Sequence, residues 1–415
     1  MRANHRSRAE RKTDTTPHMS EKASDCRTVR TFGPLSGKIL ISANTSWNIR
    51  NFRAGLIHAI RERGHEVLAA SPTDAHSPRL EELGCRHLSL PMDNKGASPI
   101  RDLGLFLRYV RLLRRERPDV FLGYTIKPNI YGSLAARLLR IPVINNVSGL
   151  GTAFIRDNWL TRIVKALYRL ALRSSARVFF QNEDDRSLFV ELKLAQPEQT
   201  ALLPGSGIDL EQFRPRQTES PQPGAPCFLL IARLLWDKGV GEFVDAARIV
   251  KTNFPDARFQ LLGFLDAENR TAISKATVDE WVSEGIVEYL GVADDVRPFI
   301  AASDCVVLPS YREGTPRTLL EAAAMGKPLV TTDVPGCREV VEHGKNGFLC
   351  EVRNPADLAQ KLLDFIGLSD VQRSRMGQAS RVKVERQFDE NIVIQRYLET
   401  IEEILKAKGK GVAGR

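Results

Sequence analysis

Residues 309–341 read PSYREGTPRTLLEAAAMGKPLVTTDVPGCREVV, and this stretch decides the fold class. One apolar run, CVVLPS at 305–310, ends where the stretch begins, and a second, PLVTTD, follows at 328–333. Short apolar runs of this kind are typical of buried parallel strands. The segment between them is helical in composition and begins near Pro316, where the missing N–H of a proline does no harm. Strand, helix and strand in this order predict a parallel α/β sheet.

The same alternation continues on both sides of this unit. Five earlier apolar runs alternate with helical segments, and after a break at residue 226 a second series of six runs includes the two just quoted. We therefore predict two Rossmann-like, doubly wound domains that face each other across a cleft. The predicted strands lie at 38–43, 66–71, 120–125, 142–147 and 177–182, and then at 227–232, 258–263, 287–291, 305–310, 328–333 and 348–352.

Changes in composition mark the domain boundaries. Residues 1–35 are polar and basic without an apolar segment, which predicts a disordered tail rather than a signal peptide. Residues 207–226 are rich in Pro, Gln and Ser and predict a linker between domains at 36–206 and 227–388. In 389–415 the apolar residues recur at helical spacing, and we expect a helix that crosses back to the first domain. Because open α/β sheets bind ligands at the carboxyl ends of their strands, we expect the site in the cleft.

The overall composition restricts the kind of partner and the compartment. The 415 residues carry 60 Lys and Arg against 50 Asp and Glu, a net charge of +10. This balance favours an anionic partner, such as nucleic acid, a phosphorylated substrate or an acidic membrane face, without choosing among them. The six cysteines have neither metal-site nor disulfide-framework spacing, and no apolar run reaches the roughly 18 residues of a membrane span. We expect a cytoplasmic protein.

Two loops carry charges suited to a phosphorylated ligand. A helix that begins at Pro316 would direct the amides of Arg317 and Thr318 outward, which is a favourable place for a phosphate. Glu313 precedes this helix and Glu321 lies inside it among apolar residues, where its carboxylate needs a partner such as ribose hydroxyls. The alternative is that both glutamates lie on a solvated surface.

The second loop is IARLLWDKGVGEF at 231–243. Arg233 ends the preceding strand, and Lys238 follows before a helix that Gly239 opens. A guanidinium fork and an ammonium group on one strand-to-helix loop can clamp a diphosphate. The alternative is an exposed loop with ordinary charges.

Arg233 and Lys238, followed by EGTPRTLLE at 313–321 and by Gly326-Lys-Pro, resemble the signature of family 4 glycosyltransferases. The resemblance covers about residues 37–407 and implies the two-domain GT-B fold, with the acceptor on the N-terminal domain and the nucleotide sugar on the C-terminal one. It implies that Arg233 and Lys238 bind the donor diphosphate, that Glu313 holds the transferred sugar and that Glu321 binds the ribose. The donor-binding residues that follow are Arg233, Lys238, Glu313, Gly314, Thr315, Arg317, Thr318 and Glu321, with Arg233, Lys238 and Glu313 as the catalytic ones.

Further segments narrow the resemblance. IARLLWDKGVGEF and FDENIVIQRYLE (388–399) are most similar to N-acetylgalactosaminyltransferases that extend undecaprenyl-diphosphate-linked sugars. YTIKPNIYGSLAARLL (124–139) and NNVSGLGTAF (145–154) are similar to bacterial capsule and exopolysaccharide transferases. The implied reaction moves a hexose or N-acetylhexosamine, with retention, from a nucleotide diphosphate sugar (a UDP-sugar on family weighting) to a lipid-linked saccharide in polysaccharide biosynthesis. The nucleotide sugar is a substrate, and no cofactor is expected.

The sequence departs from the family at one position. Many members carry a histidine before the glycine pair of one strand-end loop, and Ser148 stands there in NNVSGLG. A front-face retaining mechanism does not need that histidine, because the leaving phosphate can take the acceptor proton while cations stabilise its charge. No DxD-type metal site occurs: the pairs Asp184-Asp185 and Asp294-Asp295 precede predicted helices, where carboxylates favour the helix dipole. We expect a metal-independent reaction.

The acceptor side rests on polar residues that follow strands of the first domain. They face the predicted cleft, and Lys127 is suited to an acceptor diphosphate; the alternative for about half of them is a plain turn role. The predicted acceptor-binding residues are Asn44, Thr45, Trp47, Lys127, Ser148, Gly149 and Gly151, with Ser46 beside them.

Two basic amphipathic stretches bear on location. Residues 101–117 and 156–177 mix Arg and Lys with Leu, Phe, Trp and Tyr at helical spacing. Each must bury an apolar face in its own domain, and that role alone is one interpretation. Their excess positive charge favours contact with anionic lipid as well, at the inner face of the cell membrane.

Two other functions share parts of this pattern. A nucleotide-sugar 2-epimerase of the same fold would bind the donor and transfer nothing, and the Glu313 and Glu321 pair argues for transfer. A non-catalytic protein that binds an anionic ligand fits the charge, but no aromatic platform or recognition-helix pattern supports nucleic-acid binding. A dehydrogenase is disfavoured, because ANTSWN (43–48) follows the first strand instead of a G-x-G-x-x-G turn.

Overall fold

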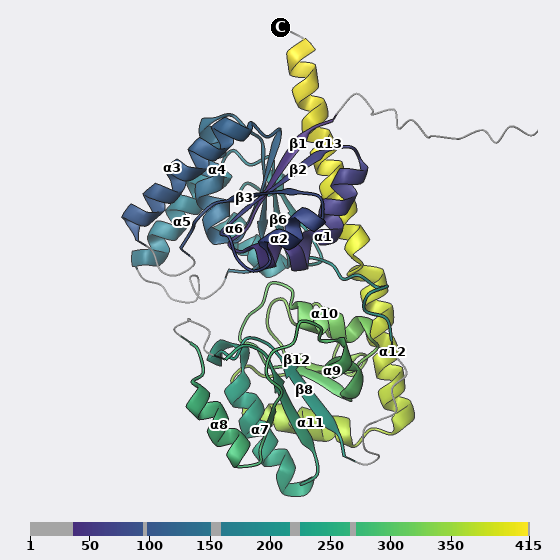
Figure 1. The fold of residues 1–415 in the computed structure, drawn as a ribbon. Helices are drawn as coiled ribbons and strands as arrows, with labels where there is room; N and C mark the ends of the chain where they lie inside the picture. The colour runs from purple at the N-terminus through teal and green to yellow at the C-terminus, as the bar shows by residue number, and fades with distance from the viewer. Residues whose placement is uncertain (1–35, 94–97, 151–158, 216–224, 266–270, 414–415) are drawn as a thin grey trace, which may run out of the picture.

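The computed structural model describes residues 36–93, 98–150, 159–215, 225–265 and 271–413. The tail, residues 216–224 of the predicted linker and Gly151 lie outside these ranges. The described residues form two α/β domains, one above the other in Figure 1, each built on a parallel sheet with helices on both faces. This arrangement confirms the predicted fold class.

The N-terminal domain contains a seven-stranded sheet in the order β3-β2-β1-β4-β5-β6-β7. Neighbouring strands are parallel, and in the centre Leu40 pairs with both Leu68 and Phe121. The strand order reverses between β1 and β4, which is where open α/β sheets bind ligands. The strands are β1 Lys38–Ser42, β2 Glu66–Ser71, β3 Arg86–Ser89, β4 Val120–Tyr124, β5 Val143–Val147, β6 Arg177–Phe180 and β7 Thr200–Leu202.

Helices cover both faces of this sheet because the strands are apolar on both sides. Ile39 and Ile41 pack under one group of helices, and Leu40 and Phe121 pack under the other. The helices are α1 Ser46–Glu62, α2 Ser77–Glu82, α3 Pro99–Glu116, α4 Ser133–Leu138, α5 Trp159–Leu172 and α6 Glu183–Glu191, with a π-helical turn η1 at Pro128–Gly132 and a 3-10 turn η3 at Pro197–Gln199.

The C-terminal domain contains a six-stranded parallel sheet in the order β10-β9-β8-β11-β12-β13, which reverses between β8 and β11. Its strands are β8 Cys227–Ile231, β9 Arg258–Leu262, β10 Glu288–Tyr289, β11 Cys305–Leu308, β12 Leu329–Thr332 and β13 Gly347–Cys350. Its helices are a 3-10 turn η4 Trp236–Lys238, α7 Val240–Asn253, α8 Lys275–Ser283, α9 Arg297–Ala302, α10 Arg317–Ala324, α11 Pro355–Ile366 and α12 Asp370–Gln387.

The last helix, α13 (Glu390–Ala413), leaves the second domain and packs on the first (Figure 1). Val393, Tyr397 and Ile401 lie one turn apart and are buried in the core beneath α1 and β4. The hydroxyl of Tyr397 accepts a hydrogen bond from Asn146 Nδ2 at 2.9 Å. The helix therefore ties the end of the chain to the N-terminal sheet.

The beginning of the predicted linker is packed against the second domain. Ile208 and Phe213 are buried in its core, and the backbone of Ile208 pairs with Phe388 and Glu390 where α12 ends and α13 begins. The two chain crossings between the domains thus lie side by side.

Several elements differ from the sequence-based expectation. β3 and β7 were not predicted, because their sequences, RHLS and TAL, are too short and too polar to form an apolar run. α2 was not predicted either, and it has only six residues. The helix predicted from residue 129 onwards begins as the π-helical turn η1. The surface helix α12 was also missed, because its sequence, DVQRSRMGQASRVKVERQ, has only a weak apolar periodicity.

Candidate active site

Two loops of the C-terminal domain meet at the point where its strand order reverses. Lys238 follows β8, Glu313 follows β11, and Lys238 Nζ donates a hydrogen bond to Glu313 Oε1 in a mostly buried ion pair. The backbone joins the same loops, since Asp237 O accepts from Tyr311 N at 3.0 Å and from Ser310 Oγ at 3.2 Å. The structure therefore brings together two charges that lie 75 residues apart in the chain.

A glycine makes this close approach possible. Gly239 has a positive φ of 71°, and a Cβ there would lie 1.9 Å from the carbonyl oxygen of Pro309. No other residue type fits this position without moving the backbone. Gly239 therefore fixes Lys238 against the end of β11.

The loop of Glu313 is supported from the other side by the turn after β12. Glu313 N donates to Pro335 O at 3.2 Å. Gly336 has a φ of 87°, and a Cβ there would lie 2.6 Å from Glu313 O and 2.4 Å from Gly314 O. Gly336 was not among the predicted site residues, although VPG at 334–336 is a turn signal.

Helix α10 begins beside Glu313, as the sequence predicts, with Pro316 as its N-cap. The amides of Arg317 and Thr318 lie in its first turn, where the helix has no earlier carbonyl to accept them. These backbone amides and the helix dipole together make the N-terminal end of α10 suitable for a negatively charged group.

The partner of Glu321 is a side chain of its own helix. Arg317 Nε donates to Glu321 Oε1 at 3.0 Å, and both side chains are largely buried. Burial raises the pKa of Glu321, and the charge of Arg317 opposes that rise. The guanidinium of Arg317 also lies 5.4 Å from the ring centre of Phe52 in the other domain. Arg317 thus contacts both domains.

Arg233 lies two residues after β8, on the same loop as Lys238. Its side chain is exposed, and within the described part of the chain it forms no side-chain hydrogen bond or ion pair. The structure places Arg233 near the Lys238 and Glu313 pair in the fold without a contact between them.

Gly314 and Thr315, which the sequence assigns to the donor, contact the N-terminal domain. Gly314 O accepts from Asn182 Nδ2 at 3.1 Å, and Thr315 N donates to Gln181 Oε1 at 3.0 Å. A Cβ on Gly314 would lie 2.3 Å from Ser148 O, so only glycine allows this approach. The loop of Glu313 is thus enclosed between the two domains.

The loops after β5 and β6 form the opposite wall. Ser148 is exposed, and Gly149, with a φ of 125°, faces Gly314 so closely that a Cβ would lie 3.3 Å from its nitrogen. The predicted acceptor residues at this position are therefore adjacent to the loop of Glu313. The position of Gly151 lies outside the described residues.

An ion pair that the sequence analysis missed joins the domains. Arg312 contacts Asp185, which is fully buried in the first turn of α6. Burial raises the pKa of Asp185, and Arg312 opposes the rise. Asp184 and Asp185 lie inside this helix rather than before it, because Asn182 is its N-cap. The run QNEDD after a strand was the available signal.

The residues after β1 lie at the strand-order reversal of the first sheet. Thr45 caps α1 by accepting from Asn48 N at 3.0 Å, so the plain structural role applies to it. Asn44 is partly buried beside it. Trp47 is 39% exposed and packs edge-on against Phe52, with ring centres 5.4 Å apart. Trp47 is therefore the large side chain that this loop exposes.

Lys127, which follows β4, is already paired. Its Nζ lies 2.8 Å from Asp102 Oδ1 on α3, and both side chains are mostly buried. Burial raises the pKa of Tyr131, and the carboxylate of Asp102 adds to the rise. Lys127 is thus half of a neutral pair rather than a free cation.

Among the described residues, no three His, Cys, Asp or Glu side chains gather closely enough to hold a metal ion. Over the same ranges, the structure contains no helix with the length and apolarity needed to span a bilayer.

Two parallel-sheet domains, with charged loops that meet between them at the strand-order reversals, define a GT-B glycosyltransferase. Two family models match the chain: "Glycosyl transferase 4-like domain" over residues 49–205 and "Glycosyl transferases group 1" over residues 225–367. The chain belongs to this family of glycosyltransferases, family 4, as its motifs indicate. It is therefore a glycosyltransferase.

Curated relatives cover most of the chain. The N,N'-diacetylbacillosaminyl-diphospho-undecaprenol alpha-1,3-N-acetylgalactosaminyltransferase of Campylobacter jejuni is 31% identical over 86% of this chain and 96% of its own. The capsular polysaccharide biosynthesis glycosyltransferase CapM of Staphylococcus aureus is 23% identical over 82% and 90%. The UDP-Gal:alpha-D-GlcNAc-diphosphoundecaprenol alpha-1,3-galactosyltransferase of Escherichia coli is 26% identical over 65% and 70%.

Solved structures show the same fold. Anabaena HepE in complex with UDP-glucose superposes with a TM-score of 0.73 at 20% identity, over 88% of this chain and all of its own. A glycosyltransferase from Rickettsia africae superposes with a TM-score of 0.72 at 19% identity, over 89% and 99%. These likenesses support the GT-B fold.

Proposed function

We propose that this enzyme transfers a hexose or N-acetylhexosamine from a UDP-sugar, with retention, to a saccharide linked to a lipid diphosphate in surface polysaccharide synthesis. The observation that carries the proposal is the contact between Lys238 and Glu313 at the strand-order reversal. The lipid diphosphate is supported by the Campylobacter and Escherichia relatives, whose names specify diphosphate-undecaprenol acceptors.

The charges fit a diphosphate leaving group. The bond between the sugar anomeric carbon and the diphosphate oxygen breaks, and the acceptor oxygen bonds to the same face of that carbon. The acceptor proton goes to the leaving phosphate oxygen, so no protein base is consumed. Lys238, the exposed Arg233 and the first amides of α10 stabilise the negative charge that develops on the diphosphate.

Glu313 is the residue we assign to the sugar. Its carboxylate accepts from Lys238, and with a bound donor it would accept from sugar hydroxyls while Lys238 turns to the diphosphate. Glu321 lies within the next helix and would accept from ribose hydroxyls beside Arg317. This scheme needs neither a histidine at Ser148 nor a metal ion, because its cations belong to the protein.

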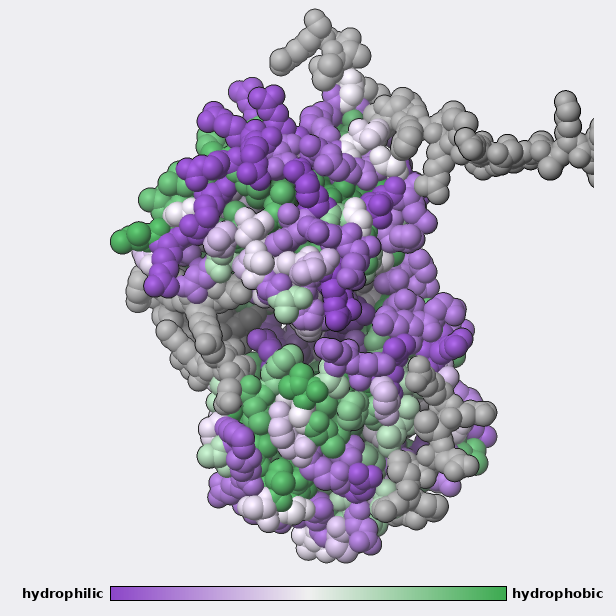
Figure 2. Space-filling view, in the orientation of Figure 1, coloured by the Kyte–Doolittle hydropathy of each residue, from purple (hydrophilic) through white to green (hydrophobic). Residues whose placement is uncertain are grey.

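We also propose that the enzyme acts at the inner face of the cell membrane. On α3, Ile100, Leu103 and Leu107 are 85%, 59% and 53% exposed and lie on one stripe, with the exposed Arg111 and Arg114 on the same side. The opposite side of α3 is buried, so the helix serves the core as well. Figure 2 shows hydrophobic and hydrophilic side chains interleaved over the upper domain, on the side where Figure 1 places α3. Apolar side chains flanked by arginines suit an anionic lipid surface.

A transfer assay tests the reaction. Purified protein is incubated with a panel of UDP-sugars and a short-chain prenyl-diphosphate-linked monosaccharide, and the product linkage is determined by NMR. We expect one donor to give an α-linked lipid product with unchanged yield in EDTA. An inverted linkage or a loss of activity in EDTA would contradict the retaining or metal-independent part. A C2-epimer of the donor without a lipid product would favour the epimerase instead.

A sedimentation assay with phosphatidylcholine vesicles that contain phosphatidylglycerol tests the membrane contact. We expect Leu107→Glu to weaken vesicle binding and Val371→Glu, at an exposed valine of the second domain, to leave it unchanged. Equal binding of both variants would contradict the assignment of α3.

A further inference from the structure

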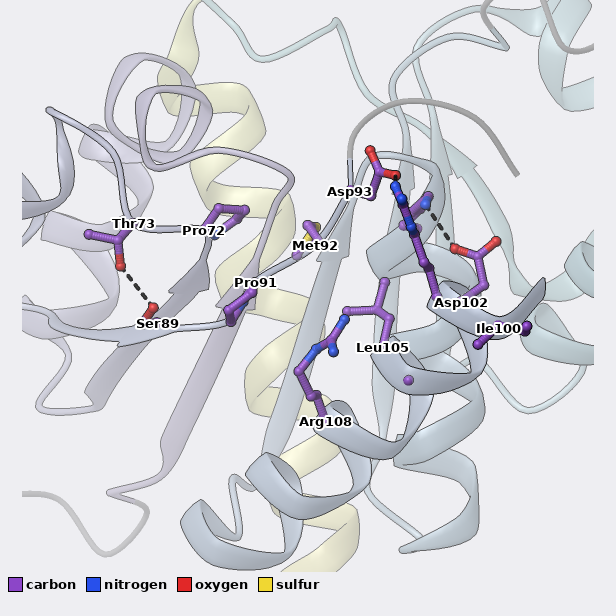
Figure 3. Close-up of a pocket in the computed structure, with 13 residues that line it drawn as sticks. Pro72, Thr73, Ser89, Pro91, Met92, Asp93, Ile100, Asp102, Leu105 and Arg108 are labelled. Atoms are coloured by element: carbon purple, nitrogen blue, oxygen red, sulfur yellow. Dashed lines mark hydrogen bonds and ion pairs between the residues drawn. The ribbon is translucent and has the colours of Figure 1, made fainter. Parts of the chain in front are cut away.

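A concave site lies on the N-terminal domain, beside the loops of the predicted acceptor site. It has a volume of about 610 Å³ and is formed by the residues after β2 and β3 and by one side of α3 (Figure 3). Lys127, after β4, also lines it. The pocket therefore opens at the same edge of the sheet as Trp47, which follows β1.

Most charges of the pocket are paired with one another. Arg101 Nη1 lies 2.8 Å from Asp93 Oδ2, and Lys127 Nζ lies 2.8 Å from Asp102 Oδ1. The exception is Arg108, which forms no ion pair among the described residues and whose Nε is buried without a hydrogen-bond partner. In Figure 3 dashed lines join the other charged residues, and none reaches Arg108. Three cations against two carboxylates leave one positive charge, and it belongs to Arg108.

The remaining lining is largely apolar. Pro91, Met92 and Leu105 form the wall around Arg108, and Ile100 lies at the rim. Ile100 also belongs to the exposed stripe of α3, so the pocket opens next to the surface that we assign to the membrane. A lone guanidinium beside apolar side chains fits a phosphate group that carries an alkyl chain, because the fork matches the phosphate oxygens.

We propose that this pocket binds the diphosphate of the lipid-linked acceptor and that Arg108 is the residue that contacts it. This proposal rests on the proposed function and deepens it, since it locates the diphosphate end of the acceptor. The hydroxyl that receives the sugar lies at the other end of the acceptor. The diphosphate sits under α3 with the lipid directed to the membrane, and the saccharide extends along the sheet edge toward Glu313. Lys127 serves the site by holding Asp102, which would otherwise repel the phosphate.

The test is the kinetics of Arg108→Gln with a short-chain prenyl-diphosphate-linked sugar in the absence of membranes. We expect the KM for this acceptor to rise about tenfold or more, as for the loss of a charge-assisted hydrogen bond, while the KM for the donor stays unchanged. The acceptor KM of Arg108→Lys should fall between the values of the wild type and of Arg108→Gln. The matched control is Arg79→Gln, at an exposed arginine of α2 outside the pocket lining, and should behave like the wild type. An unchanged acceptor KM in a folded Arg108→Gln protein would overturn the proposal.

Two further measurements separate the sources of phosphate and the two proposals. Binding of inorganic diphosphate, followed by calorimetry, should lose one event in Arg108→Gln and none in Arg79→Gln. Binding to phosphatidylglycerol vesicles should decrease only slightly, and by the same amount, in Arg108→Gln and Arg79→Gln. A loss of vesicle binding specific to Arg108→Gln would assign the pocket to phospholipid headgroups and overturn the acceptor role. If the wild type transferred sugar to no diphosphate-linked acceptor, the proposed function would be wrong, whereas the calorimetry would still decide whether the pocket binds a diphosphate.

Discussion

The strand-end loops of the two domains, which face each other, present different groups. On the C-terminal edge, Lys238 is paired with Glu313, and Arg317 is paired with Glu321. On the N-terminal edge, the buried Oδ1 of Asn48, Oγ1 of Thr125 and Oδ1 of Asn146 have no hydrogen-bond partner within the described structure. On the first edge Lys238 and Arg317 are paired with carboxylates, while Arg233 is exposed and has no ion pair among the described residues. The second edge presents buried polar atoms.

This difference suggests how each edge recognises its ligand. A diphosphate can displace Glu313 from Lys238, because both carry negative charge and the phosphate carries more. The acceptor side offers scattered hydrogen-bonding groups and the exposed ring of Trp47, which suit a neutral saccharide. The donor is therefore selected by charge, and the saccharide of the acceptor by shape and hydroxyl positions.

The largest effect is expected from Lys238→Ala. Loss of the cation beside Glu313 should lower kcat/KM about 100-fold or more, since the developing diphosphate charge loses its nearest partner. Stabilisation by UDP-sugar in a thermal melt should be lost as well. Lys345→Ala removes an exposed lysine of the same domain, paired with Glu342, and serves as the control. Donor kinetics equal to the wild type would break the assignment of the donor edge.

The contact between the edges gives the next effect. Arg312→Ala leaves the fully buried Asp185 without its cation and should destabilise the protein by about 3 kcal/mol in urea denaturation. Asp185→Asn in the same chain should restore much of the loss. Arg338→Ala removes two exposed pairs, to Asp333 at 2.8 Å and to Asp184 at 3.7 Å, and should cost less than about 1 kcal/mol. Equal effects of the two arginines would show that the interface pair is not buried in solution.

Trp47→Ala probes the acceptor edge. We expect the acceptor KM to rise about tenfold, the scale of a lost aromatic contact of about 1.4 kcal/mol, with the donor KM unchanged. Phe254→Ala is matched in exposure, at 39%, and lies in the other domain. A change in the donor KM instead would assign Trp47 to the donor site and contradict the proposed difference between the two edges.

The smallest effect concerns Glu390, where α13 starts. Burial raises its pKa above the usual 4.5, with Asp209 adding to the rise, and among the described residues it has no ion pair. A raised folded-state pKa contributes stability below the unfolded pKa, and that contribution is lost as pH rises through the folded value. Glu390→Gln should therefore gain free energy of unfolding relative to the wild type between pH 4 and pH 7, by roughly 1 kcal/mol or less, and its melting temperature should rise accordingly.

Glu288→Gln is the control with the opposite sign. The hydrogen bonds from Arg258 lower the pKa of Glu288, so its contribution is present above 4.5 and lost as pH falls. This variant should become less stable than the wild type as pH rises. If both variants followed the same pH trend, the assignment of an unpaired carboxyl at Glu390 would be untenable.

The same contrast explains what the sequence predicts. The donor edge lies in two contiguous motifs, so Lys238, Glu313 and the start of α10 at Pro316 follow from local patterns. The partner of Glu321 was expected to be a ligand and is Arg317, one turn away on the same helix. Predicting this pair would require knowing that both side chains face a closed interface, and a local pattern does not contain that information.

The acceptor edge is assembled from loops after four different strands. Lys127 was predicted to bind an acceptor diphosphate, but its neutralisation by Asp102 depends on how α3 packs over β4. Arg108 and Arg312 belong to ordinary charged segments in the sequence. Only the fold leaves Arg108 without an ion pair among the described residues and buries Asp185, the partner of Arg312. Register and packing between distant segments are not encoded in a local pattern.

The central claim is that the loops after β8 and β11 hold the donor diphosphate. A crystal structure with bound UDP-sugar tests it most directly. We predict the diphosphate within hydrogen-bond distance of Lys238 and of the first amides of α10, with Glu313 turned from Lys238 to the sugar hydroxyls. A diphosphate bound elsewhere, with the Lys238 and Glu313 pair intact, would contradict the claim.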